Sequence, residues 1–183
     1  MTPPVALHEA GLQFEHQKVD LKSKRTESGA DFNAINPKGY VLALTLDSGE
    51  TLTESVAILD WIAHQDSALK PSGPLGHTHS LEALAYISTE IHKGFKPFFS
   101  GAGDAEKAKA GETILKRMEY LADRMDGDYL FGDAVSVADF YLFVMLLWAG
   151  QNGLELPGRL ASYRDRVVQL PSAQKAMSHE GLT

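Results

Sequence analysis

The residues from 36 to 59 constrain the fold most, because they predict a turn, a strand, a hairpin and a helix in immediate succession. Asn36–Gly39 reads Asn-Pro-Lys-Gly, in which proline fixes its own φ, disfavours helical backbone before it, and is followed by a glycine that tolerates positive φ. Val41–Leu46 is short, apolar and β-capable, as suits a buried strand. Asp47–Glu50 then reverses the chain, so that residues 51–52 can return as an antiparallel strand.

A helix follows this hairpin, and its start allows two interpretations. Thr53 or Ser55 can cap it, and its core face is formed by Val56, Ile58, Leu59 and Ile62. The free backbone N–H groups of a helix start can bind an anion, which makes a carboxylate ligand at Glu54–Ser55 one interpretation. The other is an ordinary capped core helix, which these residues taken alone favour.

The segment before this unit predicts a helix over residues 3–10, a strand within 12–21 and a short helix near 31–35. With the hairpin and helix that follow, this is a thioredoxin-like α/β domain without its first strand, at residues 1–67. Residues 68–77 are rich in proline and glycine and predict a linker. Residues 78–183 predict an all-α domain.

Helical periodicity runs through this second half of the chain. One expected face, ended by Pro97, consists of Leu81, Leu84, Ser88, Ile91 and Phe95. A second helix spans about residues 104–125. The best-defined helix starts at Ser136, with Asp139 three residues later as a variant of the capping box, and its body from 140 to 148 is apolar nearly all round. Two further helices are expected, near 160–170 and from 171 onward. Trp61, Trp148 and Phe95 are expected in the core.

Composition excludes several classes of function. The chain has 183 residues, a net charge of −7 and no cysteine. The absence of cysteine excludes a disulfide framework, a thiolate metal site and a thioredoxin-type reductase. The negative charge argues against nucleic-acid binding. The longest apolar run, at 135–150, is interrupted and short for a membrane span, and Met1–Pro4 does not begin a signal peptide. We therefore expect a cytoplasmic protein.

Two motifs that resemble binding sites carry little weight. His77-x-His79 resembles a metal-binding pair, but it lies in the linker with no Asp, Glu or Cys cluster beside it in the sequence, so no metal site is predicted. Gly101-Ala102-Gly103 precedes a helix like a phosphate loop, but it follows no predicted strand and Glu106 stands where a third glycine would be required.

The amino-acid sequence of the central segment resembles that of the bacterial beta-class glutathione S-transferases. The resemblance rests on Asn-Pro-Lys-Gly-x-Val-x-Ala-Leu, on Leu-Thr-Glu-Ser-x-Ala-Ile-Leu, and on the capped Ser-x-Ala-Asp before the apolar helix. It covers essentially the whole chain. It implies conjugation of glutathione to a small electrophile, glutathione as a substrate without a metal cofactor, and a homodimer joined through the first helices of the α-domain.

The resemblance also implies where glutathione binds. The Val41 main chain would pair with the cysteinyl part, and Glu54 and Ser55 would hold the γ-glutamyl end. Lys24 would lie near the glycyl carboxylate. Because Lys24 sits in a basic segment that is also typical of a solvated loop, both interpretations of this residue stay open.

His92 is the remaining catalytic candidate. Residues 89–97 match the family segment whose histidine approaches the glutathione sulfur, with Lys93 as a second contact. A histidine can hydrogen-bond a thiol or help to ionise it near neutral pH. Without the resemblance, a histidine at the edge of an amphipathic helix would be the simpler interpretation.

Two departures from the family pattern bear on activity. The family has a cis-proline where this chain has Leu42, and because a cis bond before a non-proline residue costs about 3 kcal/mol, we expect a trans Val41–Leu42 bond and a redirected Val41 main chain. The family's first strand and its catalytic residue would fall before Met1. The alternative function is therefore a catalytically impaired relative that binds glutathione or serves as a dimer scaffold.

Overall fold

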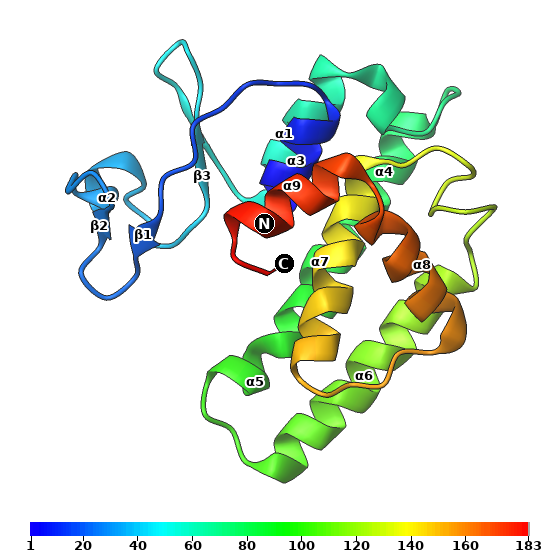
Figure 1. Cartoon of the computed structure of the whole chain (residues 1–183). Coiled ribbons are helices and arrows are strands. Elements are labelled where there is room, and N and C mark those ends of the chain that lie inside the picture. Colours follow the sequence, from blue (N-terminus) through cyan, green and yellow to red (C-terminus); the bar gives the residue numbers. More distant parts are fainter. Residues whose placement is uncertain (183) are drawn as a thin grey trace.

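Helices form most of the molecule, and two short β hairpins lie to one side of them (Figure 1). This computed structural model describes residues 1–182. The α helices are α1 (Thr2–Glu9), α2 (Phe32–Ile35), α3 (Ser55–Gln65), α4 (Gly76–Tyr86), α5 (Lys96–Phe99), α6 (Asp104–Ala122), α7 (Val137–Gln151), α8 (Gly158–Val168) and α9 (Pro171–His179). The other helical turns are η1 (Ser67–Leu69), η2 (Ile87–Ile91) and η3 (His92–Phe95), and the strands are β1 (Val19–Asp20), β2 (Arg25–Thr26), β3 (Ala43–Thr45) and β4 (Thr51–Thr53).

The strands form two separate antiparallel pairs. β1 pairs with β2, and β3 pairs with β4 in the register Leu44 opposite Leu52. The strand expected within residues 12–21 is confirmed at Val19–Asp20 alone. Residues 12–18 were wrongly predicted as strand, because among the described residues no neighbouring strand supplies ladder partners for their backbone.

The turn at residues 36–39 forms as predicted. Gly39 has a φ of 71°, and the buried Asn36 side chain donates a 2.7 Å hydrogen bond from Nδ2 to the Tyr40 carbonyl oxygen. The Asn36 Oδ1 atom accepts from the Lys38 N–H at 3.1 Å. These bonds close the turn and direct the chain into β3.

Helix α7 forms the centre of the helical domain, as its apolar sequence predicts. Asp139, fully buried, accepts hydrogen bonds from the Ser136 N–H (2.8 Å) and hydroxyl (2.6 Å), so the predicted cap is confirmed. Its carboxylate also accepts from the Leu130 N–H at 2.9 Å and the Tyr163 hydroxyl at 2.7 Å. The start of α7 is thereby tied to the preceding loop and to α8.

The helix predicted from Leu81 is divided rather than continuous. α4 is followed by the π turn η2, the tighter turn η3 and then α5. The prediction that Pro97 ends the helix was wrong. Pro97 lies in the first turn of α5, where the missing N–H of proline has no intrahelical partner to lose.

One hydrophobic core runs through both halves of the chain. α1 packs against α3, α7 and α9, and its Val5 belongs to the same buried cluster as Ile62 of α3 and Phe143 of α7. In Figure 1, α1 (blue) lies beside α9 (red). The division of the chain at residues 67 and 78 stays a prediction. Among residues 1–182, no helix is long and apolar enough to cross a lipid bilayer.

Candidate functional site

The start of α3 presents the two residues predicted to hold the γ-glutamyl end. Ser55 is the first helical residue and Glu54 is the N-cap, with a φ of 71° that is uncommon for a residue other than glycine. The prediction of a Thr53 or Ser55 side-chain cap was wrong, because within residues 1–182 no side-chain cap bond is made to this helix start. Its free backbone N–H groups therefore remain available to an anion.

Two neighbours engage the exposed Glu54 carboxylate. Lys38 Nζ donates to Oε1 at 2.5 Å, and the Tyr40 hydroxyl donates to the same oxygen at 2.6 Å. The bonds from Lys38 and Tyr40 lower the pKa of Glu54 below its ordinary value. The carboxylate is therefore held ionised, as the recognition of an α-amino group would require.

The Val41–Leu42 peptide bond is cis, so the expected trans bond was wrong. That expectation considered the cost of an isolated bond. In the folded chain, the Tyr40 carbonyl is held by Asn36, and the Leu42 side chain packs against the core. These contacts come from residues outside Val41–Leu42, so the trans preference of an isolated peptide bond does not decide its conformation here. The redirection of the Val41 main chain that was inferred from a trans bond does not apply.

The Lys24 side chain is held by a backbone carbonyl group, and not by the other predicted site residues. Its Nζ donates to the Gly39 carbonyl oxygen at 2.5 Å, across 15 residues of sequence. This bond joins the loop after β1 to the turn that precedes β3. Among the described residues, Lys24 forms no hydrogen bond with Glu54 or Ser55.

His92 lies on η3, directly after the π turn. Its Nδ1 is 2.7 Å from the Tyr141 hydroxyl, which comes from the middle of α7. The Trp148 ring packs edge-on against the imidazole, with ring centroids 5.0 Å apart. Burial lowers the pKa of His92, which favours the neutral imidazole at pH 7.

Tyr141, the partner of His92, lies on α7, which packs against α3. Burial raises the pKa of the Tyr141 phenol, and the nearby Ser88 and Ser55 hydroxyls oppose that rise. The phenol therefore stays protonated at neutral pH. Sequence reasoning missed Tyr141 because an apolar helix gives no sign of which of its residues faces another element's histidine.

An open cavity of about 310 Å³ lies beside His92. Its walls are His92, Lys96, Phe99, Ser100 and Trp148. Trp148 was expected in the core; it is half-buried, packs against the Phe95 and Phe99 rings, and lines this cavity. Lys93, the predicted second contact, is exposed and is not one of the lining residues. The cavity is of a size and aromatic character that suit a small apolar molecule.

Comparison with known proteins agrees with both halves of this architecture. Residues 3–65 match the glutathione S-transferase N-terminal domain, and residues 86–171 match the glutathione S-transferase C-terminal domain. The chain is 38% identical over 185 residues to glutathione S-transferase GstA of Escherichia coli O157:H7, covering 97% of this chain and 92% of that protein. These matches define a protein with a thioredoxin-like N-terminal part and a helical C-terminal part. The chain belongs to the glutathione S-transferase family.

Solved structures show the same fold. A glutathione transferase from Methylococcus capsulatus superposes with a TM-score of 0.93 at 43% identity, covering 100% of this chain and 94% of that chain. A sphingomonad glutathione S-transferase complexed with glutathione gives a TM-score of 0.91 at 42% identity, again over 100% and 94% of the two chains. A beta-class enzyme of Sphingomonas chungbukensis gives 0.91 at 41% identity, with the same coverage.

Proposed function

We propose that the chain binds glutathione between the start of α3 and His92, and transfers its thiol to a small electrophile. The observation that carries this proposal is the hydrogen bond between His92 and the Tyr141 phenol beside the aromatic cavity, on a helix, α7, that packs against α3. It places a titratable imidazole at the wall of an aromatic cavity. The sphingomonad relative, solved in complex with glutathione, supports the choice of ligand.

The reaction follows from the groups at this site. A neutral His92 imidazole can accept the thiol proton or a hydrogen bond from it, which favours the nucleophilic thiolate. The thiolate attacks an electrophilic carbon held against Trp148 and Phe99, a carbon–sulfur bond forms, and a leaving group such as halide departs with the bonding electrons. Val41, Glu54 and Ser55 hold the peptide, Lys24 lies toward its glycyl end, and Lys93 lies outside the cavity.

A second candidate is a glutathione-binding relative with little turnover. Two observations favour it: the chain has no cysteine, and the described strands form two separate hairpins rather than one sheet. A homodimer joined through the first helices of the α-domain, in the cytoplasm, is proposed for either function on the strength of the family resemblance.

Calorimetric titration with glutathione tests whether the proposed pocket binds this ligand. We expect binding by the wild type, a loss of about tenfold or more in Glu54→Ala, and no change in Glu50→Ala, an exposed acid in the adjacent hairpin. Equal affinity in all three proteins, or binding by none, would contradict the proposed pocket.

Turnover of a nitro-activated aryl chloride then separates the two candidates. If the chain is an enzyme, we expect His92→Gln to lower kcat by about tenfold or more while glutathione affinity is retained. Glutathione binding without detectable conjugation by the wild type would instead assign the non-catalytic function.

A further inference from the structure

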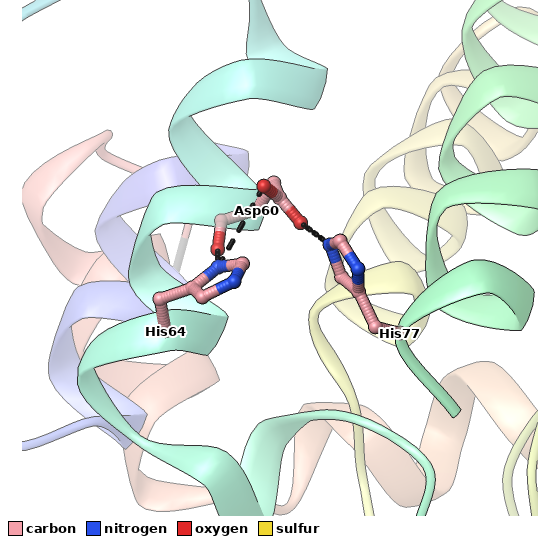
Figure 2. Close-up of side chains that lie close together, drawn as sticks. All are labelled: Asp60, His64 and His77. Atoms are coloured by element: carbon pink, nitrogen blue, oxygen red, sulfur yellow. Dashed lines mark hydrogen bonds and ion pairs between the residues drawn. The ribbon is translucent and has the colours of Figure 1, made fainter. Parts of the chain in front are cut away.

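Three side chains that can bind a metal converge where α3 meets α4, away from the glutathione site. Asp60 and His64 lie one turn apart on the same face of α3, and His77 lies in the first turn of α4. Figure 2 shows the two imidazoles on opposite sides of the Asp60 carboxylate. The chain between the helices, residues 66–75, thus folds back to bring His77 beside α3.

The distances within this group approach those of a metal shell. His77 Nε2 is 2.8 Å from Asp60 Oδ1, and His64 Nδ1 is 3.6 Å from Asp60 Oδ2. One ligand atom from each residue can be chosen so that all three lie within 4.8 Å of one another. In a tetrahedral zinc shell with bonds near 2.0–2.1 Å, ligand atoms are about 3.3 Å apart. A bound ion would replace the His77–Asp60 hydrogen bond, and rotation of the exposed His64 and His77 side chains would bring the ligand atoms to this spacing.

The chemistry of the group suits zinc. Two imidazoles and one carboxylate are ligands that Zn²⁺ prefers, and a fourth position left to water completes a tetrahedral shell. The His64 and His77 side chains are 49% and 46% exposed, and that of Asp60 is 27% exposed, so an ion can reach them from solvent. As a purely structural contact, an exposed group of this kind would contribute little to stability.

We propose that Asp60, His64 and His77 bind one Zn²⁺ ion, which ties α3 to α4 across the junction between the thioredoxin-like and helical parts of the chain. The proposal is independent of glutathione binding, because none of the three residues lines the cavity beside His92. His77 was discounted because the sequence shows no Asp, Glu or Cys cluster beside it, but in the fold Asp60 reaches it from 17 residues earlier.

The neighbouring His79 provides a matched control. It lies two residues after His77 on the same helix, is similarly exposed, and faces Glu82, with 3.5 Å between Nδ1 and Oε2. It does not belong to the cluster of Asp60, His64 and His77. A His79→Ala variant therefore removes one surface imidazole from α4 without changing the proposed site.

The binding test uses the full chain without a histidine tag, stripped of metal and free of glutathione, with Zn²⁺ in competition against a chromophoric chelator. We expect one equivalent bound by the wild type and by His79→Ala. His64→Ala and His77→Ala should each weaken this binding by about tenfold or more. Equal affinity in all four proteins, or an equal loss in His79→Ala, would overturn the proposal.

Thermal unfolding gives a second readout, because a Zn²⁺ ion that joins α3 to α4 should raise the Tm. Because an ion bound to the folded state stabilises it by mass action, Zn²⁺ should raise the Tm of the wild type and of His79→Ala but not that of His77→Ala. Far-UV circular dichroism establishes that His77→Ala is folded before the comparison. A Tm increase of the same size in His77→Ala would contradict the assigned site.

Discussion

The helical part and the hairpin part of this chain satisfy their backbone hydrogen bonds in different ways. The backbone groups in the body of α7 bond within the helix, and its apolar side chains are buried nearly all round, as with Phe140 and Phe143. β1 and β2 pair over two residues each, and β3 and β4 over three. A helix makes most of its backbone hydrogen bonds within itself, whereas a strand makes them only where a neighbouring strand lies beside it.

The comparison extends to charged groups. In the helical part, Asp139 is fully buried and accepts four hydrogen bonds. Beside the hairpin, Glu54 is half exposed and is bonded by side chains that are themselves exposed. Stability should therefore depend on the first group, and ligand recognition on the second.

The largest expected effect comes from breaking the buried network. Asp139→Ala removes the acceptor of the Leu130 N–H, of the Ser136 N–H and hydroxyl, and of the Tyr163 hydroxyl, so we expect the free energy of unfolding to fall by about 3–5 kcal/mol. Denaturant titration measures this. Asp133→Ala, at an exposed acid nearby, should differ little from the wild type. Similar unfolding free energies for the two variants would show that the network does not stabilise α7.

Hydrogen exchange should separate the two parts directly. The amides in the middle of α7 lie in the core and should exchange about 100-fold or more slowly than those of the β1–β2 and β3–β4 pairs, where every residue but Thr26 is exposed or half-buried. Amide exchange followed by NMR or mass spectrometry gives this ratio. Equal protection would mean that the hairpins open only when the whole molecule unfolds.

The smallest effect concerns the titration of His92. Burial lowers its pKa in the folded state below the ordinary value of 6.5, so the unfolded chain binds the proton more tightly. The stability gained from burying the neutral imidazole is therefore present above about pH 6.5 and is lost as the pH falls through the folded-state pKa. NMR titration of the imidazole should give a pKa below that of the unfolded chain. A value at or above it would contradict the burial of this residue.

Much of the fold could be predicted because it depends on neighbours in the sequence. The turn at Asn36–Gly39, the short helix α2 and the Ser136–Asp139 cap all use bonds between residues within a few positions of one another. The apolar body of α7 fixed its central position. Residues 12–18 and Pro97 were predicted wrongly for the opposite reason, since a strand needs a partner and a proline can begin a helix as well as end one.

The sequence by itself determined the helical centre and the start of α3, because these depend on short-range pattern, and its motifs resembled those of the glutathione S-transferase family. The tertiary structure alone decided the cis Val41–Leu42 bond, the pairing of His92 with Tyr141 49 residues away, and the meeting of His77 with Asp60. Each of these depends on where distant elements pack. A side chain's chemistry is readable from its type, but its partners are set by the packing of the whole chain.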